Sequence, residues 1–361
     1  MIIDRNAFLD VLQKVVGITE RYSIMPMLKN VKVVFGETSS IAATDLDVSA
    51  IVALPSADEN MNLIINGRLL CDIFKGLEKG DVEVISSGKI VYVRQGKTVY
   101  TLAMSGAEDY PLIDSDIKDI KGEFEIDSKT FLDAIKRVDY AASDDESRYA
   151  LCGVRLTSRN GKLATVGTDG FRLSMIRKDF PLLLEGVTIP KKSLGDIYNI
   201  VSMGEQVNVA VGKGAIKFVT ATSMLICRTI DAAYPELDGV ISINGDHDDA
   251  TVDRSEFLRA VKKVMVMAPK DRLVKVEIAN GILTLEAEGD VGKAKEAIPL
   301  VYDGSGVVFH VNGRYIIDFL INGTDEKIVL KVPKPECAIG RSIFFLGKDS
   351  STLGVVMPVR V

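Results

Sequence analysis

The stretch Ile3-Asp4-Arg5-Asn6-Ala7-Phe8-Leu9 recurs twice along the chain, as Ile126-Asp127-Ser128-Lys129-Thr130-Phe131-Leu132 and as Val252-Asp253-Arg254-Ser255-Glu256-Phe257-Leu258. In each copy, an Asp suited to the N-cap of a helix precedes an apolar stripe of the kind that one helix face buries. The Asp residues, at positions 4, 127 and 253, are separated by 123 and 126 positions. This regular spacing predicts three copies of one structural unit, each opened by a helix.

A second motif repeats at a similar period and indicates a second helix in each unit. Its copies are Asn66-Gly67-Arg68-Leu69-Leu70-Cys71-Asp72-Ile73, Pro190-Lys191-Lys192-Ser193-Leu194-Gly195-Asp196-Ile197 and Asn312-Gly313-Arg314-Tyr315-Ile316-Ile317-Asp318-Phe319. Between the predicted helices lie short β-rich runs, such as 89–94 and 98–102, which are separated by turn signals. The pattern predicts an α+β fold of three repeated domains, each with two helices packed on antiparallel sheets.

Polar, turn-prone segments near residues 121–124 and 244–250 indicate where one repeat ends and the next begins. We therefore expect domains at residues 1–122, 123–246 and 247–361. At this length, each repeat has enough residues to form a core of its own.

Length and composition place the chain among globular proteins. Its 361 residues are 47% hydrophobic, which suffices for a large interior and predicts two or three domains. The formal net charge of −6 opposes a uniformly basic nucleic-acid binder, but it leaves room for a basic surface within an acidic molecule. The four cysteines, Cys71, Cys152, Cys227 and Cys337, form no Cys-x-x-Cys pair and are expected to be buried free thiols rather than zinc ligands.

Signals for export or membrane insertion are not evident in the sequence. The N-terminus, Met1-Ile2-Ile3-Asp4-Arg5, lacks the basic region and apolar stretch of a secretory signal, and no apolar run approaches the roughly 18 residues of a membrane span. We expect a cytoplasmic protein with no membrane partner, because reducing conditions suit free thiols.

Basic residues recur in register with the repeats. Lys14, Arg137 and Lys263 share one position in the three first helices, and Arg68, Lys192 and Arg314 share one position at the start of the second helices. Since a helix advances about 100° per residue, the first set falls opposite the apolar stripe and faces solvent or a ligand. A solvated helix face explains any single cation, whereas threefold recurrence favours a basic stripe suited to phosphate contacts without base readout.

Several weak catalytic patterns have simpler structural explanations. Gly96-Lys97-Thr98 imitates the end of a phosphate-binding loop, but its place between two β-rich runs indicates a hairpin turn. Asp45, Asp47 and the run Asp144-Asp145-Glu146 are acidic enough to hold Mg²⁺, yet turns at strand ends account for them. His247 and His310 are too few for a histidine-based triad. The sequence predicts no catalytic residue, no metal site and no cofactor.

Six further stretches resemble one known family. They are Met25-Pro26-Met27-Leu28-Lys29-Asn30-Val31, Ala43-Thr44-Asp45-Leu46-Asp47, Ala107-Glu108-Asp109-Tyr110-Pro111, Asp144-Asp145-Glu146-Ser147-Arg148-Tyr149, Thr168-Asp169-Gly170-Phe171-Arg172-Leu173 and Met357-Pro358-Val359-Arg360-Val361. Their order and spacing are similar to those of the β subunit of bacterial DNA polymerase III, the sliding clamp. The resemblance implies a non-enzymatic processivity factor for DNA replication, in which a head-to-tail homodimer of three-domain chains forms a ring around duplex DNA.

The resemblance also implies roles for particular residues. The DNA-facing set would combine the in-register cations with neighbouring loop residues: Lys14, Arg21, Arg68, Arg137, Arg148, Tyr149, Lys192, Lys263 and Arg314. In the dimer interface, Tyr100 and Leu102 of one chain would meet Met265 and Val266 of the other.

The replicative polymerase and the clamp loader would bind a peptide pocket through short linear motifs. Its residues would be Leu151, Thr168, Gly170, Phe171, Arg172, Leu173, Pro235, Val240, Asn312, Tyr315, Val355, Met357, Pro358, Val359 and Arg360. Phe171 stands where the family commonly has His, and Val359-Arg360-Val361 replaces the more frequent Met-Arg-Leu. The alternative for the tail is an ordinary buried last strand.

Two functions of other classes remain open from the sequence. One is a peptide-binding scaffold that does not encircle DNA, and the other is a nucleic-acid-processing enzyme that uses Asp45 and Asp47.

Overall fold

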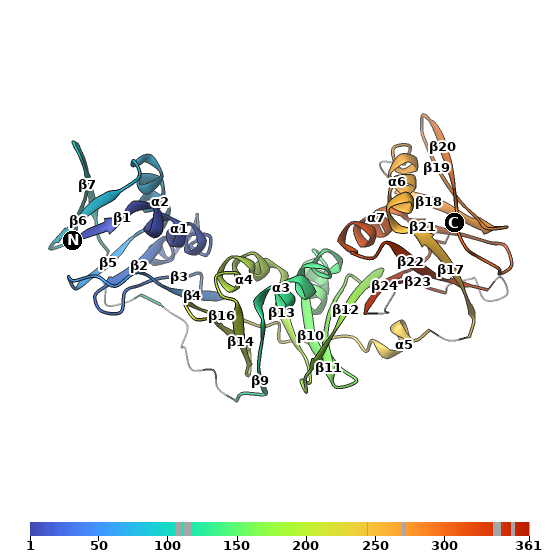
Figure 1. The fold of residues 1–361 in the computed structure, drawn as a ribbon, viewed down its shortest axis with the longest axis horizontal. Helices are drawn as coiled ribbons and strands as arrows, with labels where there is room; N and C mark the ends of the chain where they lie inside the picture. The colour runs from blue at the N-terminus through green and yellow to red at the C-terminus, as the bar shows by residue number, and fades with distance from the viewer. Residues whose placement is uncertain are drawn as a thin grey trace. The chain divides into compact units, whose positions relative to one another are not determined.

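The computed structural model describes residues 1–105, 110–111, 117, 119–243, 245–268, 270, 272–334, 341–347 and 351–360. Residues 107–109 of one family-like stretch, Asn244 at the second predicted boundary, Cys337 and Val361 lie outside the described residues. Within these limits the chain folds as two compact units (Figure 1). The first is Met1–Leu132 with Lys192–Thr229, and the second is Asp133–Lys191 with Ile230–Val361.

The first unit holds a four-stranded and an eight-stranded antiparallel sheet, in the orders β1-β6-β7-β8 and β5-β2-β3-β4-β16-β15-β14-β9. Its strands are β1 (Ile2–Asp4), β2 (Asn30–Phe35), β3 (Ser40–Thr44), β4 (Val48–Ala53), β5 (Met61–Asn66), β6 (Asp81–Ser87), β7 (Ile90–Gln95), β8 (Thr98–Ala103), β9 (Gly122–Asp127), β14 (Gln206–Val211), β15 (Ala215–Val219) and β16 (Ser223–Arg228). Its helices are α1 (Arg5–Val15), η1 (Pro26–Lys29), α2 (Gly67–Gly76), η4 (Lys191–Ser193) and α4 (Leu194–Val201), and α3 (Ser128–Lys136) begins in it.

The second unit repeats this plan, with sheets in the orders β13-β10-β11-β12-β24-β23-β22-β17 and β20-β19-β18-β21. Its strands are β10 (Gly153–Arg159), β11 (Lys162–Thr168), β12 (Arg172–Pro181), β13 (Val187–Pro190), β17 (His247–Asp253), β18 (Leu273–Ala279), β19 (Ile282–Gly289), β20 (Gly292–Pro299), β21 (Val307–Asn312), β22 (Lys327–Pro333), β23 (Ile343–Leu346) and β24 (Thr352–Val356). Its helices are η2 (Asp139–Ala141), η3 (Glu146–Leu151), α5 (Asp238–Ile241), α6 (Arg254–Met265) and α7 (Gly313–Asn322).

The predicted helix starts are confirmed at all three repeats. The Oδ1 atoms of Asp4, Asp127 and Asp253 each accept a hydrogen bond from the backbone N–H three residues on, at 2.7, 2.7 and 2.8 Å. Asn66 caps α2 in the same manner, and Asn312 caps α7 by accepting from the N–H of Arg314, two residues on. Such caps satisfy donors that the first helical turn leaves unpaired, so the repeated Asp marks each start in sequence and in structure alike.

Each apolar stripe is buried, as its spacing predicts. Phe8 and Leu12 of α1 are buried, and the Phe8 ring lies 4.7 Å from that of Phe74 on α2. Phe257 and Val261 of α6 belong to the main core of the second unit. Burying a side chain of this size contributes roughly 1.5–3 kcal/mol, so these stripes hold the helices on the sheets.

The two eight-stranded sheets cross the repeat boundaries. Strand β4 of the first repeat pairs with β16 of the second, and β12 of the second pairs with β24 of the third. The middle repeat therefore divides its strands between the two units. The domain bounds predicted from sequence stay predictions, although β9 begins at Gly122 and β17 at His247, next to them.

Two of the simpler interpretations are supported by the fold. Gly96 and Lys97 form the tight turn between β7 and β8, with Gly96 at φ +56°, so the loop-like motif is a hairpin. Cys71 and Cys227 are buried free thiols, but the expectation of burial is wrong for Cys152, which is half-buried because it lies at the end of the surface turn η3. Each helix within the described ranges is too short or too polar to cross a membrane.

Candidate functional site

An apolar cavity of about 180 Å³ opens in the second unit. Its wall comes from η3, from the turn between β11 and β12, from the segment that leads into α5, and from β24 with the residue after it. The lining residues are Leu151, Thr168, Gly170, Phe171, Arg172, Leu173, Pro235, Glu236, Leu237, Val240, Val355 and Met357. A cavity of this kind suits a few apolar side chains of a partner, with polar groups at its edge to orient them.

The turn between β11 and β12 is built by its own side chains. Thr168 donates its hydroxyl to the carbonyl of Arg172 at 2.6 Å, and Asp169 Oδ1 accepts from the N–H groups of Phe171 and Arg172 at 2.9 and 3.0 Å. Gly170 has φ +88°, and a Cβ there would lie 2.8 Å from Nη1 of Arg148. Glycine therefore permits this backbone and leaves the mouth of the cavity clear.

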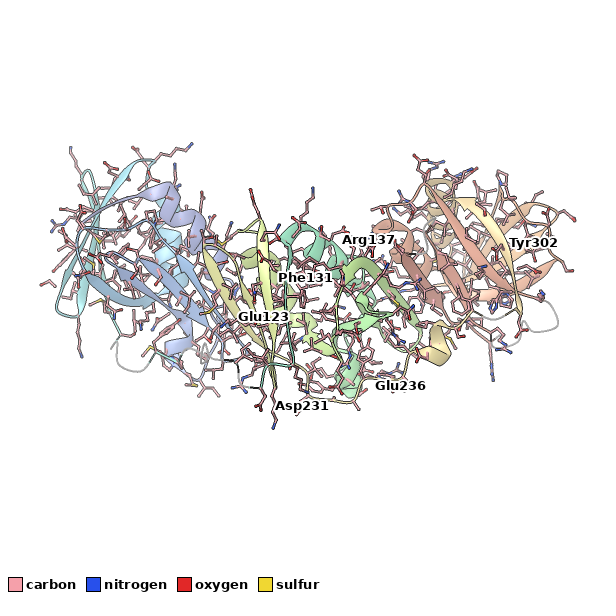
Figure 2. All side chains as sticks on the ribbon, turned by 60° about the horizontal axis from the view of Figure 1, so that its bottom comes forward. Glu123, Phe131, Arg137, Asp231, Glu236 and Tyr302 are labelled. Carbon is pink, nitrogen blue, oxygen red and sulfur yellow. The ribbon has the colours of Figure 1, made fainter. Side chains whose placement is uncertain are left out.

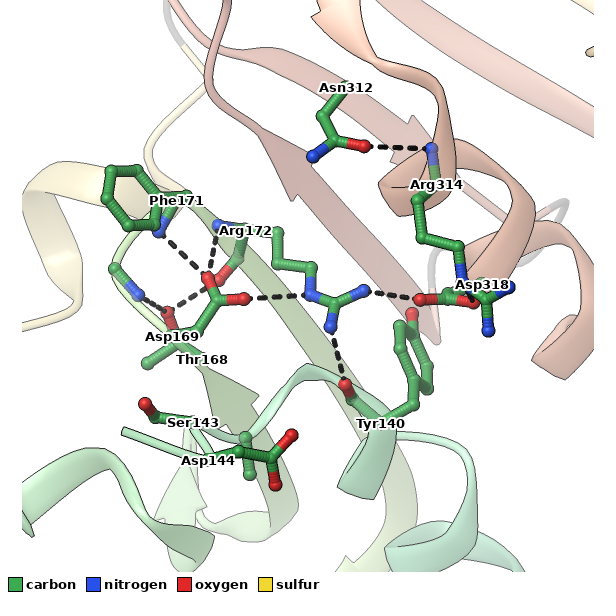
Figure 3. Close-up of polar contacts among 12 residues, drawn as sticks. Tyr140, Ser143, Asp144, Thr168, Asp169, Phe171, Arg172, Asn312, Arg314 and Asp318 are labelled. Carbon is green, nitrogen blue, oxygen red and sulfur yellow. Dashed lines mark hydrogen bonds and ion pairs between the residues drawn. The ribbon is translucent and has the colours of Figure 1, made fainter. Parts of the chain in front are cut away.

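Arg172 is held by three oxygen atoms (Figure 3), and its guanidinium also lies near two tyrosine rings, those of Tyr140 and Tyr315. Its Nε donates to Asp169 Oδ2 at 3.0 Å, Nη1 to Asp318 Oδ2 at 2.7 Å, and Nη2 to the Tyr140 carbonyl at 2.8 Å. The guanidinium also lies 4.6 Å from the Tyr315 ring centroid. Because Arg172 and Asp318 are only 14% and 12% exposed, this arginine is a fixed part of the cavity wall.

Ten of the fifteen pocket residues named from the sequence line this cavity, and five do not. Of those five, Tyr315 stacks on Arg172, Asn312 caps α7, and Pro358, Val359 and Arg360 follow the cavity residue Met357. The sequence missed Glu236 and Leu237 in the wall, and Asp169, Asp318 and Tyr140 around Arg172. Asp318 had one available signal, since it is in register with Asp72 and Asp196 of the other repeats.

The C-terminal tail divides at Met357. Strand β24 is buried throughout, as the alternative of an ordinary last strand predicts. Beyond it the chain leaves the sheet: Met357 and Val359 are 40% and 42% exposed, and their N–H groups donate to the carbonyls of Phe171 and His310. The tail is thus fixed by backbone bonds while its side chains stay accessible.

In the first unit, the in-register cations differ in exposure. Lys192 is 67% exposed and forms an ion pair with Asp47, and Lys14 on α1 is half-buried. Helix α1 packs against α4, which begins two residues after Lys192. Arg68 is half-buried, and its Nη2 donates to the Thr19 carbonyl at 3.1 Å. This hydrogen bond fixes the segment that follows α1, so Arg68 has a structural role as well. Arg21 is exposed on that same segment.

In the second unit, Lys263 is 63% exposed and pairs with Glu296 at 2.6 Å, and Arg314 is 57% exposed. Arg148 donates to the Asp169 carbonyl at 2.6 Å and lies 4.6 Å from the Phe171 ring centroid. Tyr149 is 57% exposed. Arg148 therefore borders both the apolar cavity and the surface.

Arg137, which directly follows α3, departs from the expectation that it faces solvent or a ligand (Figure 2). Its side chain is only 12% exposed. The guanidinium donates to the carbonyl of Asn322 at 3.2 Å and to the hydroxyl of Thr352 at 2.8 Å. Helix periodicity does not predict this burial, because the partners of Arg137 lie on α7 and β24, far away in sequence.

Acidic residues of the first unit form turns, as the simpler interpretation of Asp45 and Asp47 predicts. Asp45 Oδ1 accepts from the N–H groups of Asp47 and Val48 at 3.0 and 2.7 Å. Burial raises the pKa of Asp45, and burial together with the nearby Asp45 charge raises the pKa of Asp196 to about 6. The described part of the chain contains no group of three or more His, Cys, Asp or Glu residues placed to hold a metal ion.

Three family models match the chain: the N-terminal, central and C-terminal domains of the DNA polymerase III beta subunit match residues 1–114, 125–236 and 244–340. The chain belongs to the DNA polymerase III beta subunit family. It is thus a sliding clamp, a non-catalytic processivity factor of DNA polymerase III, and the enzyme alternative does not hold.

Beta sliding clamps from other bacteria are similar in sequence to this chain over most of its length. The beta sliding clamp of Pseudomonas aeruginosa is 26% identical over 99% of each chain, and that of Caulobacter vibrioides is 29% identical over 88% of each. The crystal structure of the P. aeruginosa subunit superimposes with a TM-score of 0.92, at 26% identity and with full coverage of both chains. A second P. aeruginosa structure, bound to griselimycin, has a TM-score of 0.92 at 25% identity, covering 100% and 99% of the two chains.

The residues named for a clamp interface lie at sheet edges or near them. Strand β8 is the last strand of its sheet, with Tyr100 half-buried and Leu102 only 7% exposed. Strand β20 is the last strand of the other four-stranded sheet. Near the end of α6, Met265 is half-buried and Val266 is 71% exposed. Edge strands carry unpaired backbone groups, which another chain can complete.

Proposed function

We propose that two copies of this chain close head to tail into a ring around duplex DNA. In this ring, strand β8 and the side chains of Tyr100 and Leu102 meet Met265 and Val266 of the second copy. The support is that each four-stranded sheet ends in an unpaired edge strand, and that Val266 is exposed beside α6. Two different surfaces meeting in this way form a heterologous contact, which closes only if the rotation between copies completes a circle.

The proposed DNA contacts come from the exposed cations Lys192, Lys263 and Arg314, together with Lys14, Arg21, Arg68, Arg148 and Tyr149. Lys192 and Lys263 each have a carboxylate partner, so a phosphate competes for a charge that is already partly screened. Contacts of this kind are weak, non-specific and dependent on salt. Such weakness suits sliding, because enclosure retains the DNA while the charges only centre it. Arg137 contributes by holding α7 and β24 rather than by touching DNA.

Partner proteins, including the replicative polymerase and the clamp loader, bind the Arg172 cavity through short linear motifs. The observation that carries this proposal is the cavity itself, which is apolar, is open beside Gly170 and has a fixed arginine in its wall. Apolar side chains of the motif fill the cavity, and polar groups of the motif form hydrogen bonds at the edge of the cavity where Arg172 lies. The P. aeruginosa clamp bound to griselimycin is a relative with a ligand, and griselimycin is therefore a suitable probe for this chain.

Retention on DNA after loading tests the ring. The protein should stay on nicked circular DNA and be lost when a restriction enzyme cuts the circle. Changing Lys14, Lys192 and Lys263 together to Glu should abolish loading and retention, because phosphate attraction becomes repulsion. A scaffold that does not encircle DNA would behave identically on circular and linear DNA, and that result would overturn the ring.

Val266→Glu tests closure separately. A buried carboxylate at the interface should convert the dimer to a monomer in sedimentation experiments and remove retention on circles. Val301→Glu is the matched control, since Val301 is also 71% exposed but lies outside the proposed interface.

A further inference from the structure

The carboxylate of Asp318 joins two arginines with different surroundings (Figure 3). Its Oδ2 accepts from Nη1 of Arg172 at 2.7 Å, and its Oδ1 pairs with Nε of Arg314 at 2.8 Å. Both contacts are charge-assisted, which makes them shorter and stronger than neutral hydrogen bonds. One anionic group is therefore shared between two cations.

The two arginines face different parts of the molecule. Arg172 is 14% exposed and lines the peptide cavity, whereas Arg314 is 57% exposed at the start of α7. Asp318 itself is 12% exposed, so water screens its charge little. A single mostly buried side chain, that of Asp318, therefore contacts both the cavity wall and Arg314.

This arrangement is confined to the third repeat among the described residues. The in-register Asp72 is exposed and has no ion pair there. Asp196 likewise has no cation in contact, because Lys192, the counterpart of Arg314, pairs with Asp47 instead. Val48 occupies the place that corresponds to Arg172. The repeat thus provides the same carboxylate three times, but only one is bridged by two arginines.

We infer that Asp318 is a positioning residue for the peptide cavity and that it couples peptide binding to the phosphate contact of Arg314. This inference rests on the proposed function. When a phosphate draws Arg314 away, Asp318 is left to Arg172 alone, and the Arg172 contact strengthens. A more firmly held Arg172 lies ready for the partner, which lowers the ordering cost of binding. By linkage, an occupied cavity raises the affinity of the protein for DNA by the same factor.

Asp318→Asn tests the positioning role. The amide keeps the shape but removes the charge, so the affinity for griselimycin should fall about tenfold, as expected for a lost charged hydrogen bond. The affinity for a short duplex at low salt should instead rise, about two- to threefold, because Arg314 is released from its counter-charge. General damage to the fold would lower both affinities, and that outcome would overturn the inference. Asp72→Asn, at the matched position of the first repeat, should change neither affinity.

Arg314→Ala tests the coupling while keeping every residue that lines the cavity. In the wild type, saturating duplex DNA should raise the affinity for griselimycin about two- to threefold, a modest value for coupling between sites. In Arg314→Ala, griselimycin should still bind, but DNA should no longer change its affinity. If DNA has no effect on wild-type griselimycin binding, or the same effect in the variant, the coupling is refuted.

Different results would contradict the proposed function and the role of Asp318. If the wild-type protein binds neither griselimycin nor duplex DNA, the proposed function fails and the inference fails with it. If it binds both, and neither Asp318→Asn nor Arg314→Ala behaves as described, the proposed function stands and only the role of Asp318 is lost.

Discussion

Two junctions between repeats have the same backbone plan but different chemistry. At the first, β4 pairs with β16 so that Val48 lies opposite Cys227; at the second, β12 pairs with β24 so that Arg172 lies opposite Val356. A backbone hydrogen bond at this pairing is also repeated. The N–H of Arg228 donates to the Asp47 carbonyl at the first junction, and the N–H of Met357 donates to the Phe171 carbonyl at the second. The strand pairing alone therefore does not determine what the junction binds.

The difference lies in a few side chains on this shared plan. The turn of the first junction has Leu46 at φ +76°, where the second has Gly170 at φ +88°. Arg228 donates Nε to the Leu46 carbonyl and so covers the first turn, whereas the second junction has the accessible Met357 at that place. A glycine, an arginine and a short apolar tail are thus the changes that turn a structural junction into a candidate binding site.

Exchange of Arg172 for the first-junction residue should have the largest effect. Arg172→Val removes the cation that contacts Asp169 and one of the two that contact Asp318, and losing one partner of a mostly buried ion pair costs about 3–5 kcal/mol of unfolding free energy. Chemical denaturation measures this change, and Val48→Ala at the first junction is the control for loss of strand packing. A variant as stable as the wild type would show that the two junctions do not differ in this respect.

Exchange of Gly170 should act on binding rather than on stability. In Gly170→Leu, the added side chain meets Arg148 and the mouth of the cavity, so griselimycin affinity should fall about a hundredfold, while the positive φ costs roughly 1–2 kcal/mol. Isothermal titration and thermal unfolding separate the two effects. Leu46→Gly in the first unit should leave griselimycin affinity unchanged, and unaltered binding by Gly170→Leu would remove the cavity as the site.

Arg137 and Lys14 are equivalent in sequence but differ in burial. Arg137→Ala should lower the free energy of unfolding by about 1–3 kcal/mol, because the Asn322 carbonyl and the Thr352 hydroxyl lose a charged donor. Lys14→Ala should cost under about 1 kcal/mol and should instead weaken duplex binding. Equal effects of the two changes on both measurements would contradict the distinction.

Asp196 makes the first junction sensitive to pH. Its folded pKa of about 6 lies above the ordinary 3.8, so its contribution to stability is greatest below pH 4 and is lost as pH rises through 6. Asp196→Asn should therefore be more stable than the wild type at pH 7.5, by about 1–2 kcal/mol, with roughly half that gain at pH 5. Asp72→Asn should show no such trend, and a pH-independent gain in Asp196→Asn would point to another cause.

The sequence predicted what local rules control. The caps Asp4, Asp127 and Asp253, the buried stripes and the hairpin at Gly96 each depend on residues within a few positions of one another. Most of the cavity residues were named as well, but from the family resemblance of stretches such as 168–173 and not from local rules. Partners distant in sequence could not be inferred: the pairing of β4 with β16, the carbonyl of Asn322 beside Arg137, and the position of Asp318 between two arginines all depend on tertiary packing.

The division of the middle repeat between two sheets limits how this protein can be dissected. A fragment ending at residue 122 would lose β14, β15 and β16, and would leave β4 as a bare edge open to aggregation. A fragment holding only 123–246 would contain two half-sheets, each missing its neighbour. Although the sequence consists of three copies of one unit, the smallest fragment expected to fold by itself is larger than any copy, so truncations should follow the sheets and not the repeats.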